Sequence, residues 1–281
     1  MISTFIASKD RPSQLLLLLE SLDKNAHGIF DPHILYLASN DCFSEGYNIV
    51  TNTLLGKNCH WHQQRETGEI QFYKFLEYNA DNDNLICLYS DDCIFYKKMN
   101  VTKNELNRLF MDTHTFSFTF RLGKNITVKD YVINEPAIIP KEYYIFGPIL
   151  SWDYTKVPFW HPHGFTVGFD GYVYKAKDIL ELSEHRSFPR ICEWEHMICD
   201  RFLEKGHPKK YMASPYTSCL FTSQVNTVHG LAHRSSHEFN ISPEELNNKL
   251  LDGYKIDLSG FNWENINCTH GERKFEFINY E

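Results

Sequence analysis

Apolar and polar residues alternate in blocks along the first 120 residues, and these blocks predict strands that alternate with helices. Short apolar or alternating runs predict strands at residues 2–7, 33–38, 59–62 and 85–89. Apolar residues at helical spacing predict helices at residues 12–22, 43–55 and 66–78. Such alternation predicts a mostly parallel sheet that is covered by helices on both sides.

The second half of the chain has a less regular pattern. It predicts a strand at 115–121 and helices at 100–113, 177–184 and 193–206. Residues 131–165 contain five prolines and many aromatic residues, which is typical of pocket-lining loops and edge strands. Ser242 followed by Glu245 predicts a capping box at the start of a last helix.

Composition and charge narrow the classes of function. The chain has 281 residues, a formal net charge of −8 and no block of Lys and Arg, which argues against a nucleic-acid binder. The apolar run 15–19 is too short to span a bilayer, and no basic leader precedes it, so we expect a soluble protein of the cytoplasm. The eight cysteines lack CxxC spacing, which argues against a zinc ribbon or a disulfide framework.

Two adjacent carboxylates, Asp91 and Asp92, follow the apolar run 85–89 directly. Neighbouring carboxylates repel each other and resist burial, yet ligands of parallel sheets bind at the carboxyl ends of the strands. A bound cation would offset the repulsion. The alternative is an ordinary solvated Asp-Asp turn.

This acidic triplet, Ser90-Asp91-Asp92, and the turn Ser8-Lys9-Asp10-Arg11-Pro12 after the first strand resemble a GT-A fold, family-2-like glycosyltransferase. The likeness is greatest to members encoded by large algal viruses and some bacteria. In that family a DXD motif holds Mn²⁺ or Mg²⁺ against the diphosphate of a nucleotide sugar. The resemblance implies that Asp92 is a metal ligand and that Asp91 shares the metal or contacts a ribose or sugar hydroxyl. Ser90 departs from the family pattern.

The resemblance extends to other donor-side segments. The stretch FTFRLGKN, residues 118–125, is similar to an SLRLGxN stretch of the family, in which Arg121 would hold a phosphate. The alternative for Arg121 is a surface salt bridge. Asp10 and Arg11 would meet the base and ribose, and the alternative for them is an ordinary polar turn with a helix cap. The implied nucleotide-sugar-binding residues are Ala7, Ser8, Asp10, Arg11, Ser39, Arg65, Ser90, Asp91 and Arg121.

A second family-like motif lies in the predicted helix 193–206. Family members carry EDxxLxxRLxxxG, whose second acid is the catalytic base, and its alignment here places Glu195 on that acid. Glu193 is the fallback, and Asp170 is a further catalytic candidate. The alternative is an amphipathic surface helix, whose dipole favours Glu at its N-terminus.

The segment WHPHGFTVGFDGYVY resembles the acceptor-side segment YPxSLDGHIFRT of the same family, and a core hairpin at 165–174 is the alternative. Aromatic rings suit the apolar faces of sugars. The implied substrate-binding residues are Trp152, Asp153, Trp160, His161, His163, Asp170 and Gly171. By the same analogy His229 or His233 would complete the metal shell, although either could be a surface histidine.

Taken together, the sequence predicts an α/β, GT-A (Rossmann-like) fold with a mixed, mostly parallel sheet and a less regular C-terminal region. Residues 1–125 would form the nucleotide-sugar-binding half and 126–281 the acceptor-binding, catalytic-base half of one domain. The expected activity is inverting, Mn²⁺- or Mg²⁺-dependent transfer from a UDP-sugar, with UDP-xylose suggested within the likeness, to a glycan hydroxyl. The alternatives are a non-enzymatic carbohydrate-binding protein and a sugar-phosphate nucleotidyltransferase. The latter would need a Gly-rich phosphate loop that ASKDRPSQ lacks.

Overall fold

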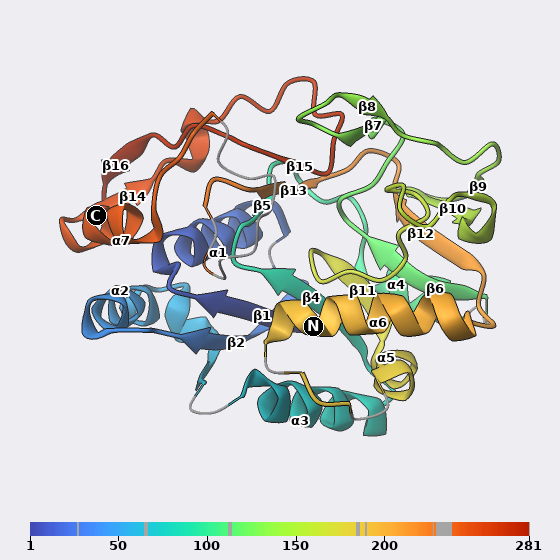
Figure 1. The fold of residues 1–281 in the computed structure, drawn as a ribbon, viewed down its shortest axis with the longest axis horizontal. Helices are drawn as coiled ribbons and strands as arrows, with labels where there is room; N and C mark the ends of the chain where they lie inside the picture. The colour runs from blue at the N-terminus through green and yellow to red at the C-terminus, as the bar shows by residue number, and fades with distance from the viewer. Residues whose placement is uncertain are drawn as a thin grey trace.

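The structure is a computed structural model, and it describes residues 1–26, 28–64, 67–111, 114–183, 186–188, 190–226, 228 and 238–280, apart from the side chain of Cys192. Its centre is a nine-stranded sheet (Figure 1). In order across the sheet, the strands are β3 (His60–Gln63), β2 (Phe30–Leu37), β1 (Ile2–Lys9), β4 (Leu85–Ser90), β11 (Tyr172–Lys175), β6 (Thr115–Thr119), β12 (Tyr211–Pro215), β10 (Ile149–Asp153) and β9 (Tyr144–Phe146).

Most of these strands point the same way. The neighbours from β3 to β4 are all parallel, and only β11 and β10 run against the other seven strands. Strands from residues 1–125 and 126–281 are interleaved, because β11 lies between β4 and β6. The expected α/β fold with a mixed sheet flanked by helices is therefore confirmed.

Helices cover both faces of the sheet (Figure 1). Successive residues of β1 point to opposite faces, so Ile6 belongs to the core cluster with α1 and α2, whereas Phe5 belongs to the one with α3, α5 and α6. The α-helices are α1 (Pro12–Ala26), α2 (Asp41–Asn52), α3 (Gly68–Asp81), α4 (Lys103–Met111), α5 (Ala176–Ser183), α6 (Ile191–Lys205) and α7 (Pro243–Leu251).

Smaller elements surround this core. The strand β5 (Cys93–Phe95) follows the acidic turn and pairs with β13 (Leu220–Ser223), which pairs with β15 (His270–Gly271). The remaining elements are β7 (Val128–Asp130) paired with β8 (Glu135–Pro136), β14 (Tyr254–Ile256) paired with β16 (Phe277–Asn279), and the 3₁₀ turns η1 (Gly56–Asn58), η2 (Tyr154–Lys156) and η3 (Leu258–Gly260).

Local sequence signals set several boundaries. The capping box at α7 is confirmed, since Ser242 Oγ accepts from the Glu245 amide and the Glu245 carboxylate accepts from the Ser242 amide. Edge strands in the Pro-rich segment are confirmed by β8 and β9. The predicted helix 100–113 starts three residues too early, because α4 begins at Lys103. The Thr102 hydroxyl caps this end: it accepts from the Glu105 amide and donates to the Glu105 carboxylate. None of the described helices is long and apolar enough to cross a bilayer.

Candidate functional site

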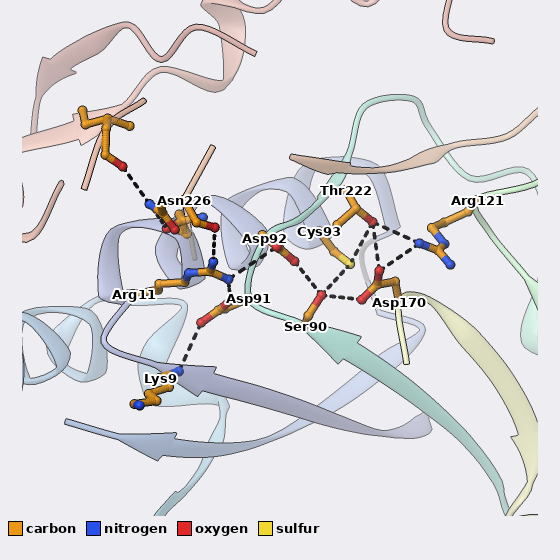
Figure 2. A network of polar contacts seen from close by, with 12 residues as sticks. Lys9, Arg11, Ser90, Asp91, Asp92, Cys93, Arg121, Asp170, Thr222 and Asn226 are labelled. Atoms are coloured by element: carbon orange, nitrogen blue, oxygen red, sulfur yellow. Dashed lines mark hydrogen bonds and ion pairs between the residues drawn. The ribbon is translucent and has the colours of Figure 1, made fainter. Parts of the chain in front are cut away.

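The acidic turn lies where β4 leaves the sheet, as the sequence predicts. Ala7 of β1 pairs in register with Ser90 of β4, so Asp91 faces the end of β1. The Lys9 amide donates to Asp91 Oδ2 at 3.3 Å, and the Asp91 side chain is only 4% exposed (Figure 2). Burial raises the pKa of Asp91, although the nearby Arg11 opposes that rise.

The turn after β1 delivers Arg11 to both carboxylates. Asp10 adopts a left-handed φ of 54°, and its Oδ1 accepts from the Ser39 amide at 2.7 Å. Arg11 Nη1 then lies 3.1 Å from Asp91 Oδ1 and 3.4 Å from Asp92 Oδ2. The SxxRP turn and the acidic turn, eighty residues apart, therefore form one ion-pair cluster.

A serine joins Asp92 to a third carboxylate. Ser90 Oγ lies 2.6 Å from Asp92 Oδ1 and 2.5 Å from Asp170 Oδ1. A hydroxyl has one proton and can donate to only one of the two carboxylates. Asp92 and Asp170 therefore repel each other when both are ionised. Burial raises the pKa of Asp92 to about 6; Arg11 opposes this rise, and the charges of Asp170 and Asp91 add to it.

Arg121 holds the other side of Asp170. Its Nη1 donates to Asp170 Oδ2 at 2.8 Å, and Thr222 Oγ1 donates to the same oxygen at 3.3 Å (Figure 2). The guanidinium also lies over the Tyr172 ring, 5.5 Å from its centre. Arg121 is therefore buried against a carboxylate that comes from the segment between β10 and β11.

Glu195 joins this cluster from α6. Its Oε1 accepts from the amide of Phe169, the residue before Asp170, at 3.1 Å. Burial raises the pKa of Glu195 to about 7; repulsion by Asp170 adds to the rise and Arg121 reduces it. A carboxyl with a pKa near neutrality can gain and lose a proton under ordinary conditions.

Glu193, the fallback, lies in a different setting. Its Oε1 accepts from the guanidinium of Arg190 in a partly exposed pair three residues apart. The structure thus places Glu195, and not Glu193, beside Asp170.

Oxygen ligands for a hard cation are present in this cluster. One atom each from Asp92, Asp170 and Cys93 lies within 4.8 Å of the others. Burial keeps the pKa of the Cys93 thiol well above its usual value, so the two carboxylates are the suitable donors for Mn²⁺ or Mg²⁺. Among the described residues, four carboxyl groups share the cluster with two guanidinium groups: Asp91, Asp92, Asp170 and Glu195 face Arg11 and Arg121. When all four carboxyl groups are ionised, two negative charges are in surplus. A divalent cation fits both the donors and this surplus.

Three of the predicted residues, Arg65, His229 and His233, lie outside the described residues. The remaining donor-side residues line the end of β1: Ser8 Oγ lies 2.6 Å from the Tyr47 hydroxyl, and Tyr47 also accepts from the Arg11 amide. These two contacts hold the turn at residues 8–12 against α2.

Gly171 is required by the backbone at this site. Its φ is +73°, and a Cβ there would meet Leu220 Cδ2 at 2.0 Å. Its amide donates to the Leu88 carbonyl at 2.7 Å, which ties the chain to β4 directly after Asp170. Gly171 thus positions Asp170.

Two of the predicted acceptor-binding residues belong to the core instead. Trp152 is 0% and His163 1% exposed, and the Trp152 Nε1 donates to the His163 carbonyl at 2.7 Å. The two rings meet edge to face with 5.4 Å between their centres, and Trp152 belongs to the core cluster that includes α6. The structure therefore places the side chains of both predicted substrate-binding residues in the core, without exposed surface for a sugar.

Asp170 and Gly171 belong to the cluster described above, whereas Trp160, Asp153 and His161 lie at or near the surface. Trp160 is 61% exposed. Asp153 lines a cavity of about 360 Å³ together with Tyr144 and Lys156, and His161 Nδ1 accepts from the amide of Ile138 in the wall of the same cavity.

Several members of the cluster were not predicted. Thr222, in β13, bonds Asp170, and the Asn226 carbonyl accepts from Arg11 Nη2 at 2.5 Å. Neither residue stands in a recognisable motif. Only the pairing of β13 with β5 brings them to the acidic turn.

No family model matches the chain, and no curated protein matches it. Solved structures of S. aureus TarS are similar. TarS 1-349 in complex with UDP-GlcNAc has a TM-score of 0.49 and 14% identity, and the match covers 83% of this chain and 61% of that one. TarS 1-349 in complex with UDP has a TM-score of 0.43 and 15% identity, with 76% and 60% covered. The present chain therefore spans less than two thirds of these two structures.

Proposed function

We propose that the protein is an inverting glycosyltransferase that moves a sugar from a UDP-sugar to a glycan hydroxyl with the help of a divalent cation. The observation that carries this proposal is the meeting of Asp92, Asp170 and Glu195 in one polar cluster at the end of β4. These residues are far apart in the sequence, and the family resemblance implies each of them as a site residue: Asp92 as a metal ligand, and Asp170 and Glu195 as catalytic candidates.

The donor side offers charge for a nucleoside diphosphate. Arg11 and Arg121 bring two guanidinium groups to the acidic cluster. Guanidinium groups suit the oxygens of a diphosphate. Asp92 and Asp170 would hold Mn²⁺ or Mg²⁺, which would neutralise the charge that develops on the departing diphosphate. Asp91, which is tied to Arg11 and Lys9, would keep the turn in place.

Glu195 supplies the base that an inverting transfer needs. In its ionised form it would take the proton of the acceptor hydroxyl. The hydroxyl oxygen forms a bond to the anomeric carbon while the bond from that carbon to the diphosphate oxygen breaks, and the nucleoside diphosphate leaves. The raised pKa of Glu195 makes it a better proton acceptor than an exposed carboxylate would be.

The acceptor is proposed to be a glycan that contacts the surface residues Trp160 and Asp153. UDP-xylose is proposed as the donor on the family likeness alone. The donor is therefore to be identified by screening a panel of nucleotide sugars.

The first experiment is a thermal-shift screen of nucleotide sugars with Mn²⁺ or Mg²⁺. A ligand of the folded state raises the melting temperature by mass action. We expect a UDP-sugar to raise it in the wild type and in Glu193→Gln, a matched surface carboxylate, and to have a much smaller effect in Asp92→Asn. A chain that no nucleotide sugar stabilises would not be this enzyme.

The second experiment incubates the stabilising donor with candidate glycans and measures nucleoside diphosphate release and the anomeric configuration of the product. Inversion is expected. Retained configuration would overturn the base role of Glu195, and glycan binding without any release would favour a carbohydrate-binding protein.

A further inference from the structure

A second group of potential metal ligands lies at the edge of the sheet. Asp31 and His33 are two residues apart on β2, and His60 and His62 are two residues apart on β3. Residues with this spacing share one face of a strand, and the two strands pair in parallel with His33 opposite His60. Three imidazoles and one carboxylate are thus held on adjacent strands.

The ligand atoms converge on the Asp31 carboxylate. His60 Nε2 lies 3.3 Å from Asp31 Oδ1, and His33 Nε2 lies 3.8 Å from Asp31 Oδ2. One donor atom from each of these three residues lies within 4.8 Å of the others. Tetrahedral zinc with bonds of about 2.0–2.1 Å keeps its ligand atoms roughly 3.4 Å apart. The two separations from Asp31, 3.3 Å and 3.8 Å, lie on either side of that value.

Packing fixes the His33 ring, whereas the His60 ring is free to adjust. The His33 ring stacks on His60 at 4.5 Å between ring centres and meets the edge of Phe75 of α3 at 5.4 Å. The His33 side chain is 25% exposed and that of His60 56%. The more exposed His60 ring therefore has room to turn its nitrogen toward an ion bound by His33 and Asp31.

We propose that Asp31, His33 and His60 bind a divalent transition-metal ion of the Zn²⁺ class, with His62 or water in the fourth position. Two imidazoles and a carboxylate are a ligand set that zinc accepts, and an imidazole is mostly neutral at pH 7. The ion would cross-link β3, the outermost strand at this edge, to β2 and thereby stabilise the sheet edge.

This site is separate from the proposed nucleotide-sugar site. Asp31 pairs with Ser3, whereas the acidic turn meets Lys9 at the other end of β1. Six residues of strand correspond to about 20 Å. The proposal therefore does not depend on the proposed transferase activity.

The experiment titrates the full chain, without a histidine tag, with ZnCl₂. Binding is followed by calorimetry and by melting temperature, and CoCl₂ is used as a spectroscopic probe of imidazole coordination. We expect one imidazole-coordinated site that stabilises the wild type, at least tenfold weaker binding to it in His60→Gln and in His33→Ala/His60→Ala, and unchanged binding in His114→Ala, an exposed histidine elsewhere.

His60→Gln is the decisive variant because its side chain is the most exposed of the three and its loss should not disturb folding. Equal zinc affinity in His60→Gln and the wild type would overturn the proposal, as would the absence of binding in the wild type. The Asp92→Asn variant should keep the zinc effect, so that failure of the transferase proposal and failure of this one are distinguishable.

Discussion

The Ser90 hydroxyl lies 2.5 Å from Oδ1 of Asp170, a residue eighty positions later in the chain. This contact joins the acidic turn after β4 to the turn before β11. Arg121 donates to the Asp170 carboxylate, and Glu195 accepts from the amide of the preceding residue, Phe169. The result is a group of carboxylates whose repulsion is only partly offset by arginine.

Asp92→Asn should stabilise the protein near pH 8 while abolishing sugar transfer. The pKa of Asp92 is raised to about 6 in the folded chain from an ordinary value of 3.8. Its proton is therefore held more tightly in the folded state, so its contribution to stability is present below about pH 4 and lost as pH rises to about 6. We expect wild type to lose about 1–3 kcal/mol relative to the variant over this range.

Urea unfolding from pH 4 to pH 8 measures this difference. Mn²⁺ at pH 8 should restore stability to the wild type more than to the variant. Parallel stability curves for the two proteins across this range would contradict the prediction.

The rate of transfer should rise with pH through about 7. Glu195 acts as a base only when ionised, and burial beside Asp170 raises its pKa to about 7. Glu195→Gln should lower the rate of sugar transfer at least 100-fold. The nucleotide sugar should still raise the melting temperature of this variant. Glu193→Gln should keep most of the activity because Glu193 pairs with Arg190 at the surface. A pH profile that is flat between 6 and 8 would exclude this role.

Gly171→Ala should destabilise the fold and misplace Asp170. The left-handed φ of +73° costs an alanine about 1 kcal/mol or more, and its Cβ would also clash with Leu220. Gly253→Ala is the matched control, since its φ is +85° and nothing lies within 4 Å. Chemical denaturation should show roughly 2–4 kcal/mol lost at Gly171 and about 1 kcal/mol at Gly253. Equal losses would mean that the contact with Leu220 relaxes without cost.

Two tryptophans near each other in the sequence should behave differently. Trp152→Ala removes a fully buried indole and should cost about 3–5 kcal/mol of unfolding free energy. Trp160→Ala changes an exposed side chain and should leave stability within about 0.5 kcal/mol. If Trp160 contacts the acceptor, its variant should raise the acceptor KM while leaving donor-induced stabilisation unchanged. The reverse order of stabilities would contradict the assignment of Trp152 to the core.

The pattern of residues determined the first part of the fold. The strands β1 to β4 and the helices between them follow from apolar periodicity and local caps, which act over a few residues. Parallel neighbours then place their carboxyl ends at one edge, so the sequence also predicted Asp91 and Asp92 at that edge. The ion pairs of Arg11 with both carboxylates were not predicted.

Tertiary structure decided the rest, because it depends on contacts between residues far apart in the chain. Trp152 and Trp160 both lie in the Pro-rich, aromatic segment 131–165. Trp152 is buried in β10, which pairs with β12, whereas Trp160 is exposed. Thr222 reaches Asp170 through the pairing of β13 with β5, and His60 meets Asp31 through the pairing of β3 with β2. Local periodicity predicts which segments are strands, but the choice of partners comes from packing the whole chain at once.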